Sequence, residues 1–194
     1  MANDMDNTRD KILDTVIRLY SQHSYEAIST KQIIEEVGIS KGTLYWHFAK
    51  KEDMFVEAYK YCYRKVVRHS RMGSDDNASA IDCLKRRLKN IIALNKTDPD
   101  YVQTVFKHTP VITTHEEPIL TVDELDELNG DISKFVREGI KNKEIVNLPE
   151  CFLVTMILYT NLAFLIYLNK HPFNYENDAV IDKMIDNLYR FLQP

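Results

Sequence analysis

Glycine and proline are scarce in this chain, with five glycines and six prolines among 194 residues. So few turn-forming residues argue against a β protein with many short strands and favour long helices. Cysteine is also scarce, and Cys62, Cys83 and Cys151 stand far apart. An odd count without metal-ligand spacing argues against a disulfide framework or a zinc site, and favours reduced thiols in a cytoplasmic protein.

The chain also lacks an excess of positive charge, because its formal net charge is −4. Basic residues are nevertheless clustered: residues 40–51 hold three lysines and no acid, and residues 64–71 add a second basic group. A local basic patch on an acidic protein suits a protein that binds DNA with one part only. A solvated helix face is the commoner explanation of such short runs, so charge alone does not decide. We expect the basic residues further along, Lys85, Arg86, Arg87 and Lys89, to form such a solvated face.

The N-terminal segment has no apolar run of the kind that a signal peptide needs, because four aspartates interrupt residues 4–14. One long apolar stretch, at 151–168, is about long enough to span a bilayer. Thr155, Thr160 and Asn161 interrupt it, and the neighbouring helices are amphipathic. It is either a membrane span or a helix buried in a dimer, and we prefer the dimer.

Apolar residues recur at helical spacing along the whole chain, which predicts an all-α fold. The expected helices cover about 8–23, 29–37, 41–48, a long stretch from 52, then 81–92, 99–106, 125–140, 149–169 and 180–192. The first three would form a helix-turn-helix bundle, joined by the long fourth helix to a second helical domain. We expect a DNA-binding domain at 1–51 and an effector-binding and dimerisation domain at 52–194.

The turn signals between 29 and 44 are specific. Ser29 and Gln32 have the spacing of a capping box at the start of the second helix. Gly38 follows that helix at the position where a left-handed conformation ends it. Ser40 is a good N-cap for the third helix, whose buried face includes Leu44. These signals predict two short helices joined by a tight turn.

The second helix of such a pair enters the major groove of DNA with its N-terminal residues at the base edges. Gly42 would let the backbone approach closely, and Lys41 and Thr43 would reach bases or phosphates. Tyr45 and His47 point away from the buried face, where their ring tips can donate to phosphates.

Four flanking residues complete the predicted DNA interface. Thr30 and Lys51 are placed to hold the neighbouring DNA backbone, and Ser40 precedes the recognition helix. Trp46 either packs against the first helix or assists at a phosphate.

The sequence here resembles the TetR family of bacterial regulators. The matching strings are STKQI at 29–33, VGISKGTLYWHF at 37–48 and KEDMF at 51–55. The resemblance covers about the first quarter of the chain, and the remainder matches only in length and helical character. It implies DNA contacts from Thr30, Lys41, Gly42, Thr43, Tyr45, His47 and Lys51. One departure is Lys50, which stands where a small capping residue is more usual and weakens the cap of the fourth helix.

The resemblance also implies a small-molecule effector pocket among the middle helices. Tyr101, Phe106, Phe135 and Tyr159 are the expected lining, although ordinary core packing is the more common reason for any one of them. The helices at 149–169 and 180–192 have wide apolar faces that need a cover. Two copies would bury these faces as a symmetric four-helix interface, which predicts a homodimer on a near-palindromic operator.

Other classes of function find little support. The chain has no nucleophile elbow, phosphate loop or metal-ligand spacing, so we expect no enzyme, metal or cofactor. His108 and His115 could donate to a metal, but solvated loop histidines are more common. The sequence therefore predicts a cytoplasmic dimeric repressor that a small molecule releases from its operator. The alternative is a DNA-binding regulator that acts through a protein partner without a ligand.

Overall fold

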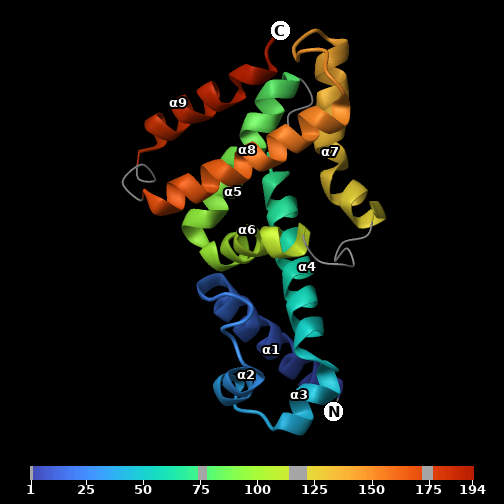
Figure 1. Ribbon diagram of the computed structural model, residues 1–194, viewed down its shortest axis with the longest axis vertical. Coiled ribbons are helices and arrows are strands. Elements are labelled where there is room, and N and C mark those ends of the chain that lie inside the picture. The colour runs from blue at the N-terminus through green and yellow to red at the C-terminus, as the bar shows by residue number, and fades with distance from the viewer. Residues whose placement is uncertain (1, 74–77, 114–121, 172–176) are drawn as a thin grey trace. The chain divides into compact units, whose positions relative to one another are not determined.

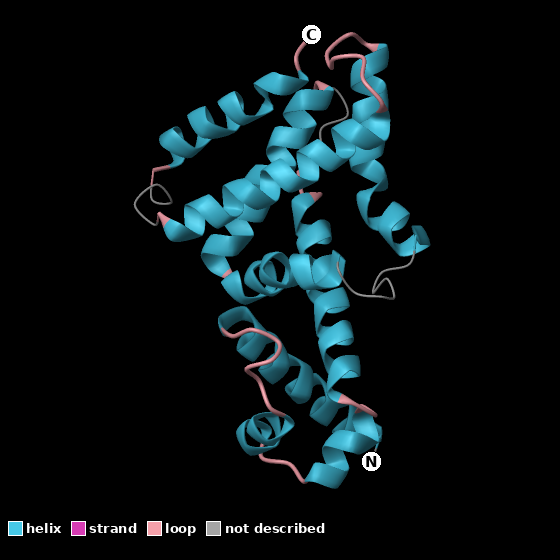
Figure 2. Cartoon of the chain, in the orientation of Figure 1, coloured by secondary structure: helices cyan, strands magenta, loops and turns pink. Residues whose placement is uncertain are grey.

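The computed structural model describes the backbone of residues 2–73, 78–113, 122–171 and 177–194. It describes the side chains of residues 7–73, 78–107, 130–171 and 177–194. Helices connected by short loops make up these residues, and none of them is in a strand (Figure 1, Figure 2). The predicted all-α fold is therefore confirmed.

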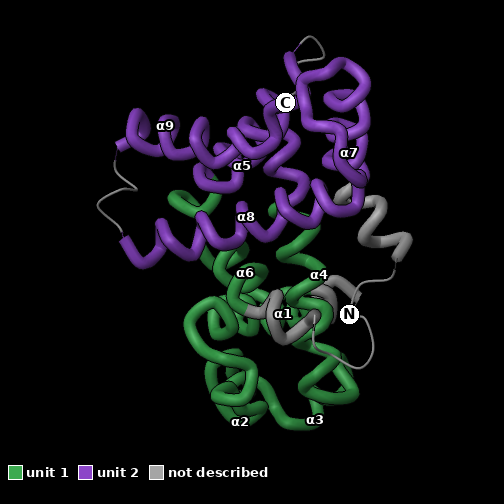
Figure 3. Tube along the Cα trace, turned by 45° about the horizontal axis from the view of Figure 1, so that its top comes forward, with its two compact units in different colours: residues 1–66, 94–121 green, residues 67–93, 122–194 purple. Residues whose placement is uncertain are grey.

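The chain divides into two compact units, each built from two segments of sequence (Figure 3). Unit 1 comprises Met1–Val66 and Leu94–Thr121, and unit 2 comprises Val67–Ala93 and Val122–Pro194. The predicted boundary at residue 51 separates two expected functions, whereas packing defines the two units. The boundary therefore remains a prediction.

Unit 1 contains the predicted helix-turn-helix. Its elements are α1 (Ala2–Gln22), α2 (Thr30–Val37), α3 (Lys41–His47), most of α4 (Lys51–Ser70) and α6 (Pro99–Thr113). Its core is made of apolar side chains at helical spacing, among them Ile12, Val16, Tyr20, Ile33, Leu44 and Met54, all fully buried. Helix α1 begins earlier than the predicted residue 8, since aspartates are compatible with the first turns of a helix.

Helix α6 is fastened to α1 inside unit 1 by polar contacts. The buried Thr104 hydroxyl donates to the carbonyl oxygen of Ile17 at 3.2 Å. The Ser21 hydroxyl donates to Asp100 at 2.7 Å, and the Lys107 ammonium donates to the Ser21 carbonyl at 3.5 Å. A shift of α6 would therefore have to break these bonds or carry α1 with it.

Unit 2 contains most of α5 (Ala80–Thr97), with α7 (Val122–Lys141), α8 (Glu150–Lys170), α9 (Asp178–Leu188) and the 3₁₀ helix η2 (Tyr189–Leu192). The predicted last helix is thus α-helical only to Leu188 and tightens into a 3₁₀ turn beyond it. Helix α8 is long and apolar enough to cross a membrane by length and composition, a test that core helices of soluble proteins also pass.

The expectation of a solvated basic face on α5 was wrong at Arg87. The basic residues at 85–89 were predicted to form a solvated face, but Arg87 is only 9% exposed and pairs with Asp131 at 2.8 Å. The other three also have partners in unit 2: Lys85 with Asp186, Lys89 with Asp182, and Arg86 with the carbonyl oxygen of Gly73. The prediction failed because acids on α7 and α9, distant in sequence, face this side of α5.

Candidate nucleic-acid interface

Helix α2 begins at the capping serine that the sequence predicted. The hydroxyl oxygen of Ser29 accepts the backbone N–H of Gln32 at 3.1 Å. The reciprocal bond of a capping box is absent from the described contacts, because the Gln32 amide donates instead to Glu36 at 3.2 Å. Half of the predicted motif is therefore present, and the serine supplies it.

The turn between α2 and α3 has the predicted geometry. Gly38 has φ +74° and ψ +38°, a left-handed conformation that is costly for residues with a Cβ. The Ser40 hydroxyl then accepts the backbone N–H of Thr43 at 3.0 Å and lies 2.8 Å from the Thr43 hydroxyl. This cap fixes where α3 begins, and so where its N-terminal residues face.

Helix α3 has one buried face and one exposed face. Leu44 is fully buried and Phe48 is 2% exposed, as predicted. Lys41, Gly42 and Tyr45 are exposed on the helix, and the Lys41 ammonium lies 5.9 Å from the Tyr45 ring centre. The exposed face therefore presents a cation, a hydroxyl-bearing ring and an accessible backbone on one short helix.

Trp46 is 65% exposed, so it does not pack against α1. Its other predicted role, assistance at a phosphate, remains a prediction. Its ring meets the half-buried His47 ring edge-on at 4.7 Å between centres. A tryptophan this exposed is a large apolar surface that a partner can cover.

The start of α4 is capped in a way the sequence did not suggest. Lys50 was expected to weaken the cap, but the Asp53 carboxylate accepts the backbone N–H of Lys50 at 3.1 Å. The Lys50 ammonium also pairs with Glu52 at 3.0 Å. The bond from the Lys50 N–H is the reciprocal half of a capping box, and it does not replace the side-chain acceptor that a small residue at position 50 would offer to the first turn.

Two predicted contact residues stand at the edges of this surface. Thr30 is the half-buried first residue of α2. Lys51, the first residue of α4, donates to the carbonyl oxygen of Tyr25 at 2.5 Å, and its ammonium lies 4.1 Å from the Tyr25 ring centre. Sequence reasoning missed this contact, because nothing in the local pattern links residues 26 positions apart.

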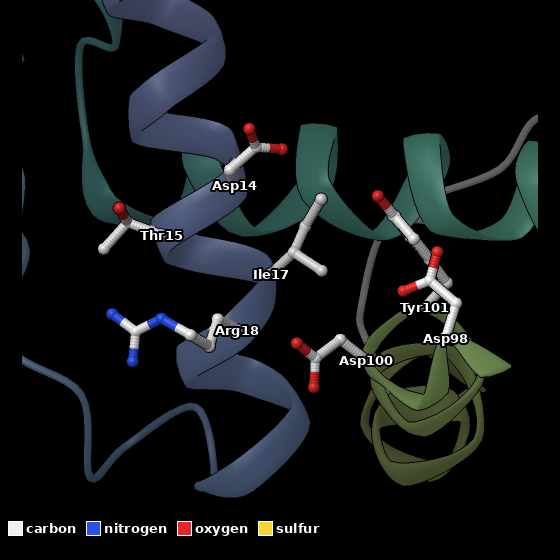
Figure 4. Close-up of a pocket in the computed structure, with 7 residues that line it drawn as sticks. All are labelled: Asp14, Thr15, Ile17, Arg18, Asp98, Asp100 and Tyr101. Atoms are coloured by element: carbon white, nitrogen blue, oxygen red, sulfur yellow. The ribbon is translucent and has the colours of Figure 1, made fainter. Parts of the chain in front are cut away.

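Unit 1 also has a polar surface pocket of about 330 Å³ between α1 and the start of α6 (Figure 4). Its lining consists of Asp14, Thr15, Ile17, Arg18, Asp98, Asp100 and Tyr101. The Lys65 ammonium lies 3.2 Å from the Tyr101 ring centre and 3.2 Å from Asp98. Tyr101 is therefore in contact with a cation of its own chain.

The four predicted effector-pocket residues are distributed over both units. Tyr101 and Phe106 lie on α6 in unit 1, whereas Phe135 and Tyr159 lie on α7 and α8 in unit 2. Tyr159 is 54% exposed, and Phe106 and Phe135 are half-buried. Among the described residues, no cluster of three His, Cys, Asp or Glu side chains could hold a metal. The side chains of His108 and His115 lie outside the described residues.

Residues 12–58, from within α1 to within α4, match the family model described as bacterial regulatory proteins, tetR family. The helix-turn-helix of this chain is that of the TetR family. The matched segment contains the capped turn and the exposed face of α3, the parts with which a helix-turn-helix regulator binds DNA.

Two curated relatives are similar to this chain over different lengths. The Staphylococcus aureus "Biofilm operon icaADBC HTH-type negative transcriptional regulator IcaR" is 24% identical over 158 residues, covering 81% of this chain and 82% of that protein. The Shigella flexneri "HTH-type transcriptional regulator AcrR" is 40% identical over 53 residues, covering 27% and 25%. Higher identity thus accompanies the shorter match.

A solved structure extends the likeness to the whole fold. A TetR family transcription regulator from Marinobacter aquaeolei has a TM-score of 0.78, covering 99% of this chain and 98% of its own. The two sequences are 16% identical, so this likeness concerns the fold alone.

Proposed function

We propose that this protein represses transcription by binding near-palindromic operator DNA as a homodimer, and that a small-molecule effector releases it. The observation that carries the proposal is the exposed face of α3, presented by a capped turn next to a small core. Repression is supported by the relative from Staphylococcus aureus, whose name describes a negative regulator. The DNA lies in the cytoplasm, where we place the protein.

The residues of α3 divide into two kinds of DNA contact. Lys41, Gly42 and Thr43 form the first turn of the helix, which faces base edges when a recognition helix lies in the major groove. Tyr45 and His47 lie further along, where ring donors reach phosphates and fix the register.

Three more residues support this interface. Trp46 supplies exposed apolar surface to the groove, and Thr30 holds the flanking backbone from the first position of α2. The Ser40 hydroxyl acts mainly by capping α3, which aims the other side chains.

The homodimer is supported by an apolar stripe along α8, which we call the α8 stripe: Phe152, Met156, Tyr159, Ala163 and Ile166. These residues follow one another at intervals of four, three, four and three, so they lie on one side of the helix. All are exposed, with 49% exposure for Phe152 and 42% for Ile166. A second copy of the stripe is the complementary cover, and a twofold axis brings the two together.

Helix α9 contributes less to this argument than the sequence suggested. Its apolar residues Ile181 and Ile185, with Tyr189 beyond them, are buried inside unit 2. Its exposed positions are mostly charged or polar, such as Asp182 and Asp186. We therefore place α8 at the centre of the proposed interface and α9 at its edge.

Release by an effector is the third part of the proposal. Residues 1–51 would hold DNA, and residues 52–194 would dimerise and bind the effector, with Tyr101, Phe106 and Phe135 as candidate lining. Tyr159, first expected in the pocket, belongs to the proposed dimer interface instead. The bonds that fasten α6 to α1 offer a route for the signal, since α6 carries Tyr101 and Phe106. An effector shifts the equilibrium only if it prefers the released form.

The experiment that tests this function begins with selection of duplexes from a random pool by the purified protein. We expect one near-palindromic sequence to be enriched and to be bound by the dimer. Enrichment of no sequence would contradict the proposal. If the duplex is bound but no compound from a library of small apolar molecules weakens binding, a regulator that acts through a protein partner replaces the ligand-released repressor.

A further inference from the structure

Arg87 is a buried cation inside unit 2 whose hydrogen-bonding capacity is only partly used. It lies on α5, is 9% exposed, and donates to the Asp131 carboxylate on α7 at 2.8 Å. Asp131 also pairs with Arg71 at 2.5 Å, so two guanidinium groups share its charge. A guanidinium has five N–H donors, and Asp131 is the single acceptor that the described residues offer to Arg87. Most of the donors of this buried cation are therefore free.

Asn161, on α8, is a second polar group in the same interior. Its side-chain oxygen accepts the Tyr189 hydroxyl at 3.0 Å, while no described residue accepts a hydrogen bond from its NH₂ group. Burial raises the pKa of Tyr189, and the bond to Asn161 and the nearby charge of Arg87 partly offset that rise. The free donors of Arg87 and Asn161 therefore belong to one polar group around Tyr189.

The residues that flank this polar group are apolar. Leu84, one turn before Arg87 on α5, and Ile157, one turn before Asn161 on α8, are each 1% exposed. Phe135 follows Asp131 by four residues on α7, so both lie on the same side of that helix, and Phe135 is half-buried. A few polar groups in apolar surroundings are typical of sites that bind small ligands.

The free donors define the chemistry of such a ligand. Unused donors on a buried cation are costly, and a carboxylate can accept two guanidinium N–H groups at once. A carboxylate brings one negative charge, which one guanidinium balances. A phosphate would bring a second negative charge into these apolar surroundings, so the observations favour a carboxylate.

We propose that Arg87 and Asn161 bind the carboxylate of a small organic acid, whose apolar body lies beside Phe135. This inference rests on the ligand-released repressor proposed above and names the chemical class of its effector. Asp131 is then a competitor of the ligand, because both present a carboxylate to the Arg87 guanidinium.

Calorimetric titration of the full-length protein tests this site without DNA. The probes are hexanoate, octanoate and phenylacetate, each paired with the corresponding alcohol, which keeps the apolar body and removes the charge. At least one acid should bind about tenfold more tightly than its alcohol, because a charge-assisted hydrogen bond is stronger than a neutral one. If no acid binds more tightly than its alcohol, the proposal is overturned.

Three variants test the assigned residues. Arg87→Met should weaken binding of the acid about tenfold, and Asn161→Leu about fivefold, without affecting the alcohol. Asp131→Asn should instead tighten binding of the acid, because it removes the competing carboxylate. The opposite sign matters, since a purely structural ion pair would respond alike to the loss of either partner. Undiminished binding in Arg87→Met, or weaker binding in Asp131→Asn, would contradict the site.

Two features guard against a merely unfolded variant. In Arg87→Met, Asp131 keeps its pair with Arg71, so no carboxylate is left without a cation. Lys89→Met is the matched control, because it removes one positive charge from the same helix at a side chain that is 45% exposed. It should bind the acid as the unchanged protein does.

The selected duplex separates this inference from the proposed function. An acid that binds through Arg87 should weaken duplex binding by the unchanged protein but not by Arg87→Met. If the acid binds and the duplex affinity stays the same, the carboxylate site stands and its role as the effector site fails. If the protein binds no selected duplex, the DNA-binding proposal fails, and calorimetry still decides the carboxylate site.

Discussion

At the residue scale, hydroxyl caps decide how the helices of the motif begin. Ser40 caps α3 through the N–H of Thr43, and Ser79 caps α5 in unit 2 through the N–H of Asp82 at 3.1 Å. The two caps have the same geometry but stand at different places in the molecule. This pair separates the effect of losing a cap from the effect of losing one at the DNA surface.

Ser40→Ala should lower the free energy of unfolding by about 1 kcal/mol and weaken operator binding, because α3 loses the bond that fixes its first turn. Chemical denaturation and a duplex titration measure the two effects. Ser79→Ala is the matched control, with a similar loss of stability and unchanged DNA affinity. If Ser40→Ala bound the duplex as tightly as Ser79→Ala does, the α3 cap would not matter for DNA binding.

Burial sets the chemistry of one thiol in unit 1. Burial raises the pKa of Cys62 to about 12, so almost no thiolate is present at pH 8. Cys62 should therefore resist iodoacetamide at pH 8 in the native protein and react once guanidinium unfolds it. Mass spectrometry of the labelled peptides measures this, and equal labelling rates in both conditions would contradict the buried position.

At the element scale, α8 differs from the other helices by having apolar residues on both sides. Leu153, Ile157 and Leu165 are buried in unit 2, while the α8 stripe faces outward. The sequence showed a helix that was apolar nearly all round, but it could not show which side the monomer covers. The structure supplies that distinction.

Tyr159→Glu should convert the proposed dimer into monomers, because a carboxylate in the middle of the stripe would be buried against its own copy. Analytical ultracentrifugation measures the mass. Met72 provides the matched control, since its side chain is 59% exposed on the turn after α4 and is not part of the α8 stripe. Met72→Glu should leave the dimer intact, and a dimeric Tyr159→Glu would place the interface elsewhere.

Contacts between residues close in sequence were predictable, whereas contacts between distant residues were not. The caps at Ser29 and Ser40 and the turn at Gly38 were predictable, because each depends on residues within four positions. The Lys51–Tyr25 contact and the Arg87–Asp131 pair were not, since both join side chains that only tertiary packing brings together. The effector-pocket residues rested on resemblance, and they stay a prediction.

At the scale of the whole molecule, the protein combines a net charge of −4 with an exposed lysine, Lys41, at the start of α3. An acidic chain has weak general attraction for DNA, so binding should depend on the shape and contacts of the helix-turn-helix. Two copies joined through α8 would bind two half-sites at once. Sequence preference and symmetry, more than charge, should then set affinity.

The central claim, that the exposed face of α3 binds DNA, has a built-in reporter. Trp46 is the single tryptophan of the chain and is 65% exposed on that helix. Its emission should shift to shorter wavelength or be quenched as the selected duplex is added. This change should be complete at one duplex per dimer. A scrambled duplex at the same concentrations should leave it nearly unchanged. Unaltered Trp46 emission while the selected duplex is fully bound would contradict the account.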